Sequence, residues 1–262
     1  MARKSLFEPL AGIKAANSNT RIVLPGQGNM TARATSGKVG VVQADSGDNL
    51  GLTSERSRQH MVQRLREKGI TDEDVLKAMG SVPRHQFVDQ ALASRAYEEA
   101  ALPIGHGQTI SQPWVVAHML SILRRGGRFG KVLEVGGGCG YQAAVLAKLF
   151  RQVYSVERVR PLYDTARGRI SVLGLRNAHF VYGDGMLGWK AQAPYDAIIV
   201  AAAGLAIPQS LLDQLEIGGR LIAPEGQTTQ RLVLIIREDT QRWSRQELEA
   251  VRFVPLKPGV QT

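Results

Sequence analysis

The chain has little cysteine and no pattern of metal ligands. Cys139 is the only cysteine among 262 residues, so an intrachain disulfide is excluded. Small disulfide-stapled scaffolds are therefore excluded too, and a reducing compartment is favoured. The five histidines are scattered through the chain and no pair of cysteines exists. The sequence consequently predicts no metal site.

Long hydrophobic runs are also missing. No apolar stretch approaches the roughly 18 residues that a membrane-spanning helix needs. The first residues, MARKSLFEPLAGIKAANS, are interrupted by charge and proline, unlike the continuous apolar region of a secretory signal. We therefore expect a soluble, cytoplasmic protein with no membrane partner, and we expect it to be a monomer.

Basic residues clearly outnumber acidic residues in the chain. The formal net charge is +10 and the pI is about 10.0, which meets the electrostatic criterion for nucleic-acid binding. The arginines, however, are spread along the chain without a dense basic tract or interleaved aromatic residues. This pattern favours a solvated basic surface that attracts acidic substrates, and it predicts no specific nucleic-acid partner.

Residues 1–50 are rich in small and polar residues and show no sustained helical or strand period. They are expected to be a loosely ordered extension. Residues 51–262 are expected to form one domain, with a helical flank and substrate segment over 51–125 and a sheet-containing core over 126–262.

The helical flank is predicted from apolar spacing. Met61, Val62 and Leu65 precede a stop at Gly69, and Thr71 with Asp74 resembles a capping box for a second helix. A third short helix is expected next, with Phe87, Val88 and Leu92 directed inward.

The second half alternates strands with helices, and such alternation predicts an α/β fold with a doubly wound, mostly parallel sheet. The last strands lack intervening helices, so an antiparallel C-terminal part is expected. The predicted strands are 131–135, 152–156, 178–182, 195–201, 219–223, 232–237 and 248–254, and the predicted helices are 141–150, 162–173 and 208–215.

A glycine-rich turn follows the first of these strands, in the stretch KVLEVGGGCGY from Lys131 to Tyr141. Four glycines remove every Cβ that could keep a ligand away from the backbone. A glycine loop after a strand suits dinucleotides, nucleotides and S-adenosylmethionine alike. The loop therefore predicts a cofactor without choosing among these three classes.

Three carboxylates bear on the choice of cofactor. Glu157 ends the second strand about 20 residues beyond the loop, where it can accept both hydroxyls of an adenosine ribose. Glu134 would repel a pyrophosphate but favour a sulfonium or amino group, directly or through water. Asp184, before Gly185, can accept from an adenine amino group, although an Asp-Gly turn is its alternative role. Together they favour S-adenosylmethionine.

The segment LPIGHGQTISQP, from Leu102 to Pro113, precedes a helix expected over 114–123. Pro113 suits the first turn of that helix, and Ser111 lies where a capping residue would be. The segment carries more glycine and hydroxyl groups than a connector needs, so a functional role for Ser111 is equally open.

From about Ser57 to Leu256 the chain resembles the protein-L-isoaspartate O-methyltransferases. Three blocks carry the resemblance in the family's order: GQTISQP, LEVGGGCGY and GDGMLGWKAQAPYDAI. In addition, VRFVPL resembles the family's C-terminal substrate-binding strand. The third block, with fixed glycine, aromatic, Ala-Pro and Tyr-Asp offsets, is the most specific. The resemblance implies a Rossmann-like methyltransferase core that repairs damaged proteins containing L-isoaspartyl residues, with S-adenosylmethionine as cofactor.

The resemblance also implies roles for single residues. Ser111 falls on the family's active-site serine, and substrate binding is implied for Thr109, Ile110, Ser111 and Val254. The residues implied for the cofactor, together with those favoured above, are Gln108, Thr109, Ile110, Glu134, Gly136, Gly138, Gly140, Glu157, Asp184 and Gly185.

Three departures from the family pattern put fine specificity in doubt, but not the class. Gly137 replaces a usual hydroxyl residue, which is expected to loosen the turn or remove a hydrogen bond, while Gly204 and Glu225 replace a proline and an apolar residue. Two alternatives stay open: a methyltransferase of the same fold acting on a small molecule or RNA, and a basic nucleic-acid-binding protein with a vestigial nucleotide fold.

Overall fold

The computed structural model describes the backbone of residues 47–126 and 130–262, and side chains from residue 54 within those ranges. The chain divides into two units, Met1–Gly51 and Leu52–Thr262. The loosely ordered extension expected over 1–50 lies outside the described residues, apart from the start of the first helix. The strands of the described ranges all lie in the second unit.

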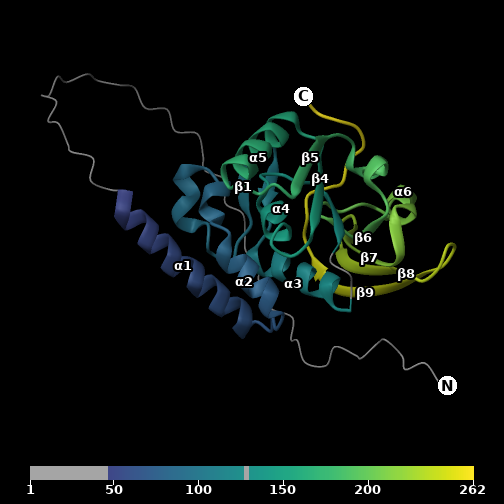
Figure 1. The fold of residues 1–262 in the computed structure, drawn as a ribbon, viewed down its shortest axis with the longest axis horizontal. Coiled ribbons are helices and arrows are strands. Elements are labelled where there is room, and N and C mark those ends of the chain that lie inside the picture. The colour runs from purple at the N-terminus through teal and green to yellow at the C-terminus, as the bar shows by residue number, and fades with distance from the viewer. Residues whose placement is uncertain (1–46, 127–129) are drawn as a thin grey trace, which may run out of the picture. The chain divides into compact units, whose positions relative to one another are not determined.

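Helices and strands alternate as the sequence predicts (Figure 1). The helices are α1 (Gly47–Glu67), α2 (Glu73–Ser81), α3 (Pro113–Arg124), α4 (Tyr141–Leu146), α5 (Arg160–Val172) and α6 (Gln209–Asp213), with 3-10 turns at Arg84–Phe87, Gln90–Arg95, Gly185–Leu187 and Lys190–Gln192. The strands are β1 (Leu102–Gly105), β2 (Gln108–Ile110), β3 (Lys131–Val135), β4 (Gln152–Glu157), β5 (Ala178–Tyr182), β6 (Tyr195–Val200), β7 (Leu215–Gly226), β8 (Gln230–Arg237) and β9 (Trp243–Val251). None of the helices in the described ranges has the length and apolar character of a membrane span.

The main sheet has seven strands in the order β5-β4-β3-β6-β7-β8-β9. Strands β5, β4, β3, β6 and β7 are parallel, and β8 and β9 continue the sheet in antiparallel fashion. This confirms the doubly wound, mostly parallel fold class. The chain order reverses direction between β3 and β6, so the carboxyl ends of these strands border the crevice where such folds bind ligands.

Two apolar clusters cover the two faces of the sheet, because alternate residues of a strand point to opposite sides. Residues from α1 to α4 pack with Val132, Val153 and Ile199 on one face. Residues of α6 pack with Leu133 and Ile198 on the other, and Figure 1 shows α4 and α6 on opposite sides of the sheet.

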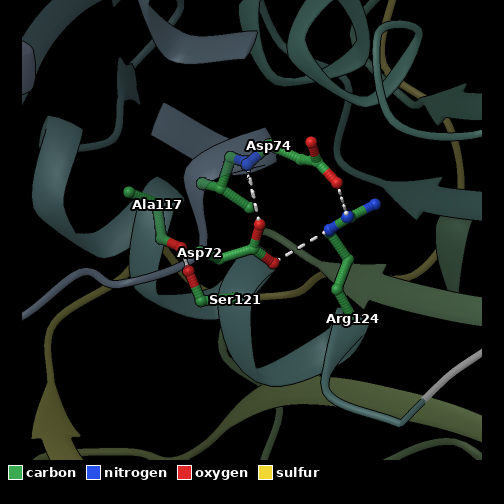
Figure 2. Close-up of polar contacts among 6 residues, drawn as sticks. Asp72, Asp74, Ala117, Ser121 and Arg124 are labelled. Carbon is green, nitrogen blue, oxygen red and sulfur yellow. Dashed lines mark hydrogen bonds and ion pairs between the residues drawn. The ribbon is translucent and has the colours of Figure 1, made fainter. Parts of the chain in front are cut away.

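The start of α2 corrects the capping prediction. Asp72, rather than Thr71, is the N-cap, and its Oδ1 accepts from the N–H groups of Asp74 and Val75 at 3.1 Å each. Figure 2 shows why Asp72 is fixed there: Arg124 at the end of α3 donates to Asp72 at 3.0 Å and to Asp74 at 2.7 Å. The ion pairs join two helix ends that are 50 residues apart in the chain.

Other boundaries also differ from the sequence prediction. The segment before α3 forms a hairpin of β1 and β2, and two 3-10 turns replace the expected third flanking helix. Phe87 at the end of the first turn and Val88 between the two turns are buried. Helix α4 ends at Leu146 instead of residue 150. The last strand runs over Trp243–Val251, not 248–254, so Val254 lies in the C-terminal segment that follows it.

Candidate active site

A cavity of about 320 Å³ opens at the carboxyl ends of the parallel strands. Its volume is at the lower end of the range of small-molecule sites. Most of its wall comes from four parts of the chain: the β1–β2 hairpin, the glycine loop after β3, the end of β4, and the C-terminal segment after β9.

The loop after β3 contains glycine because its backbone adopts dihedral angles that residues with a side chain rarely adopt. Gly136, Gly138 and Gly140 have φ values of 86°, 53° and 88°, which lie in the left-handed region that favours glycine. The N–H groups of Gly136 and Gly137 donate to the carbonyl of Val156 at 2.9 and 3.2 Å, so the end of β4 fixes the loop.

Glu157, the last residue of β4, also helps to fix the loop. The residue is almost fully buried, with 4% exposed, although it lines the cavity. Oε2 accepts from the N–H of Gly138 and Oε1 from the N–H of Val159, both at 2.7 Å. A carboxylate has about four acceptor positions, so two backbone bonds leave capacity for ligand hydroxyls.

Ser111 lies on the cavity wall at the end of the hairpin. The N-cap of α3 is Gln112, and it makes no side-chain capping hydrogen bond, so the capping role considered for Ser111 is wrong. The backbone of Ser111 is held from behind by Arg84, whose Nη2 donates to the Ser111 carbonyl at 2.7 Å.

Arg84 is fully buried, and its Nε donates to the Ala96 carbonyl at 2.7 Å. Its guanidinium lies 4.7 Å from the ring centroid of Tyr141, the first residue of α4. Burial lowers the pKa of Arg84, although the neighbouring Tyr141 opposes this shift. Arg84 thus links the serine segment to the helix behind the glycine loop.

Glu134 lies behind the loop and does not belong to the cavity wall. It is fully buried, and Ser155 Oγ donates to its Oε2 at 2.6 Å. Burial raises the pKa of Glu134 to about 8, despite the opposing hydrogen bond from Ser155. A carboxyl with this pKa is mostly protonated at pH 7, so direct contact of a Glu134 carboxylate with the cofactor stays a prediction.

Asp184 stabilises an Asp-Gly turn, which is the alternative role that the sequence offers for it. Oδ1 accepts from Met186 N–H at 2.8 Å, and Oδ2 accepts from Gly259 N–H at 2.7 Å. Arg158 donates to the Gly259 carbonyl at 3.0 Å, and Gln261 forms a bridge with Val159. The C-terminal segment is therefore held across the end of β4, beside the cavity.

Most of the predicted site residues come together in this cavity. Those on its wall are Gln108, Thr109, Ile110, Ser111, Gly136, Gly138, Glu157, Gly185 and Val254. Glu134, Gly140 and Asp184 are outside the wall, and Gly140 instead begins α4 with a left-handed backbone. Their assignment to cofactor binding stays a prediction.

Sequence reasoning missed several wall residues, among them Gln142, Arg158, Lys257 and Gln261. Arg158 directly follows Glu157, and this adjacency is the one signal that could have indicated it. Lys257 and Gln261 reach the cavity only because the C-terminal segment folds back across β4. No local sequence pattern predicts this fold-back.

The departures from the family pattern have structural explanations. At Gly137, Ser155 Oγ occupies the space where a side chain would begin. Gly204 and Glu225 are paired with each other in an isolated bridge, and Glu225 forms an ion pair with Arg245. Two of the three departures therefore belong to one local arrangement, in which the segment after β6 meets the end of β7.

The residues present fit an adenosine cofactor with a small charged end. The glycine loop presents backbone without Cβ atoms, and a Cβ added at Gly138 would lie 3.2 Å from Ile104 Cδ1. Glu157 offers acceptors for hydroxyls at the end of β4.

Comparisons with known proteins agree with this site. Residues 56–261 match the family model of protein-L-isoaspartate(D-aspartate) O-methyltransferase. A protein-L-isoaspartate O-methyltransferase of Bordetella parapertussis is 60% identical over 255 residues, covering 96% of this chain and 94% of that protein. One from Methylobacillus flagellatus is 54% identical over 213 residues, covering 80% of this chain and 96% of that protein.

Solved structures give the same result. A structure of a protein-L-isoaspartate O-methyltransferase superposes with a TM-score of 0.71 at 30% identity, covering 78% of this chain and 67% of that one. A Plasmodium falciparum structure described as the same kind of enzyme, in complex with S-adenosyl-L-homocysteine, has a TM-score of 0.66 at 26% identity, covering 76% and 98%. The chain belongs to the protein-L-isoaspartate(D-aspartate) O-methyltransferase family, whose cofactor is S-adenosylmethionine.

Proposed function

We propose that this chain transfers the methyl group of S-adenosylmethionine to the free α-carboxylate of L-isoaspartyl residues in damaged proteins and peptides. Membership of the family supports this reaction. The observation that carries it is a cavity whose wall includes both the glycine loop with Glu157 and the segment that ends in Ser111.

Methylation of a carboxylate requires little acid or base catalysis from the protein. A carboxyl group with a pKa near 4 is ionised at pH 7, so no general base is needed. When bound, S-adenosylmethionine supplies an electrophilic methyl group on a sulfonium. Catalysis then depends on holding an acceptor oxygen in line with that methyl group at about 3–3.5 Å, with water excluded.

Ser111 is assigned to orient the acceptor. Ser111 lies on the wall that also contains the loop, and Arg84 fixes its backbone by donating to its carbonyl. A hydroxyl that donates to one carboxylate oxygen leaves the other oxygen free to attack. The buried positive charge of Arg84 also favours an anion at Ser111.

The peptide around the damaged residue is assigned to the hairpin and the C-terminal segment. Strand β2 pairs only with β1, so its second edge has no strand partner among the described residues. An extended peptide can add to such an edge through main-chain hydrogen bonds, and this recognition tolerates many sequences. The carbonyl of Val254 accepts from Ala203 N–H at 2.8 Å, so Val254 would contribute through its other groups.

Three further assignments belong to this proposal. Residues 51–262 act as the methyltransferase domain, and the chain acts as a monomer in the cytoplasm. The sole cysteine, Cys139, is buried in the loop, and burial raises the pKa of its thiol, as suits a reduced structural residue.

The test offers a labelled methyl donor with an isoaspartyl peptide and with its normal aspartyl twin. We expect labelling of the first peptide only. Labelling of a small molecule or RNA, with neither peptide modified, would show that the proposed acceptor is wrong and that the enzyme methylates that other molecule. Absence of transfer together with salt-sensitive RNA binding would support the nucleic-acid-binding alternative.

A further inference from the structure

A row of three side chains lies under the glycine loop. Glu134 on β3 is the register partner of Ser155 on β4, and Ser155 is the partner of Phe180 on β5. Register partners in a parallel sheet point to the same face. The chain leaves β3 one residue after Glu134 and turns back over this row, which brings Gly137 above Ser155.

The space at Gly137 is already occupied by Ser155. A Cβ built on Gly137 would lie 2.3 Å from Ser155 Oγ, 3.2 Å from Phe180 Cε1 and 3.6 Å from Glu134 Oε2. Gly137 is absent from the residues with positive φ, unlike Gly136, Gly138 and Gly140. Its backbone therefore does not demand glycine, and the hydroxyl of Ser155 is what excludes a side chain there.

The same hydroxyl completes a buried polar contact. Ser155 is fully buried and donates to Glu134 Oε2 at 2.6 Å. Val156 and Glu157, the next two residues of β4, accept from N–H groups of the loop. Two consecutive residues at the end of β4 thus hold three consecutive glycines by hydrogen bonds, and Ser155 directly precedes these two residues.

We propose that Ser155 is a positioning residue for the cofactor loop, and that Ser155 and Gly137 form one coupled unit in which a single hydroxyl fills the space and bonds to Glu134. Ser155 does not line the cavity. Ser155 can affect the cofactor only through the position of the loop. Substitution of Ser155 must therefore change cofactor affinity and not only folding stability.

Single substitutions should each weaken cofactor binding, for different reasons. Ser155→Ala removes the hydrogen bond to Glu134 and leaves a void, which should lower affinity for S-adenosylhomocysteine about three- to tenfold. Gly137→Ser places a side chain against Ser155 Oγ and displaces the loop. We expect it to lower that affinity by more than about tenfold.

The double variant that exchanges the two residues should recover most of the loss. Ser155→Ala removes the atom at 2.3 Å, and the remaining Cβ of residue 155 is not among the three nearest atoms, the third of which is at 3.6 Å. A hydroxyl on residue 137 can then reach Glu134 Oε2, because Cβ lies only 3.6 Å from that oxygen. Phe180 must give way by a few tenths of an ångström. We expect affinity within about threefold of the original chain.

A second double variant isolates the hydroxyl. Gly137→Ala with Ser155→Ala provides the space without an oxygen, so its affinity should stay near that of Ser155→Ala alone. Gly168→Ala, at an exposed helical position with nothing within 4 Å, and Ser121→Ala, whose hydroxyl bonds within its own helix (Figure 2), serve as matched controls.

The experiment measures S-adenosylhomocysteine affinity by titration calorimetry and thermal unfolding of each ligand-free variant. Recovery of affinity in the exchange variant alone supports the coupled unit. Additive losses in the exchange variant, or a Ser155→Ala variant that melts earlier yet binds S-adenosylhomocysteine with native affinity, would overturn it. Both readouts are independent of the methyl acceptor, so a failure here is distinguishable from a failure of the proposed reaction.

Discussion

Replacing Glu157 by Gln tests how the end of β4 holds the cofactor loop. Both carboxylate oxygens accept a backbone N–H at 2.7 Å, one from Gly138 and one from Val159. An amide has a single oxygen, and its NH₂ group can only donate. Whichever way the Gln side chain turns, one of these two N–H groups loses its acceptor and faces another donor.

The magnitude can be worked out from that lost bond. A hydrogen bond to a charged group contributes about 1.5–3 kcal/mol, and about 1.4 kcal/mol corresponds to a tenfold change in affinity. The lost bond lies in the cavity wall, either at the loop or beside the C-terminal segment. We expect Glu157→Gln to weaken S-adenosylhomocysteine binding about 10- to 100-fold, more if the cofactor's hydroxyls also bond to this carboxylate.

Titration calorimetry measures the affinity, and urea unfolding of the ligand-free protein measures the stability. Glu98→Gln is the matched control, since Glu98 is exposed and pairs with Arg95 at the surface. Native affinity and native unfolding free energy in Glu157→Gln would refute the reasoning, because neither loop support nor ribose binding would then depend on Glu157.

Three further predictions concern the other parts of the site. Ser111→Ala should lower turnover about 10- to 100-fold with little change in S-adenosylhomocysteine affinity, and an unchanged rate in a peptide methylation assay would remove Ser111 from the chemistry. Arg84→Met keeps the side-chain volume but removes the donors to the Ser111 and Ala96 carbonyls. Turnover should therefore fall while cofactor affinity is largely kept. An unchanged turnover would show that Ser111 does not need the hydrogen bond from Arg84. Glu134 has a folded-state pKa of about 8, above its unfolded value, so the folded state binds the extra proton and this group's stabilisation is lost as pH rises from about 5 to about 8. Urea unfolding across that range should show a decline that Glu134→Gln flattens, and an equal decline in both proteins would contradict the pKa shift.

Much of the fold is predictable because it depends on local signals. Near-continuous apolar strands such as Tyr195–Val200 indicate burial on both faces, and the alternation with helices gives a parallel sheet. The glycine loop after the first strand of this sheet likewise indicates a cofactor site, because missing side chains allow a ligand to approach the backbone closely.

What could not be predicted depends on contacts between distant segments. Asp72 caps α2 because Arg124, 52 residues later, fixes its carboxylate. The hairpin before α3 has strands of only four and three residues, too short for a visible alternation. Lys257 and Gln261 reach the cavity through a fold-back of the C-terminal segment, which is held by Arg158.

Gly137 shows the limit of motif comparison most clearly. As a departure from the family pattern, it suggests a lost hydroxyl and a looser turn. The structure places the hydroxyl of Ser155 at that point, supplied by β4 and in contact with Glu134. A pattern read along the chain cannot register a group supplied from a neighbouring strand.

The most direct test of the central claim is the position of the transferred methyl group. The purified chain, S-adenosylmethionine and an isoaspartyl peptide are incubated briefly, and tandem mass spectrometry locates the modification. The proposed reaction predicts a methyl ester on the α-carboxyl of the isoaspartyl residue, with none on the aspartyl twin. A methyl group on any other carboxyl, or equal modification of both peptides, would contradict it.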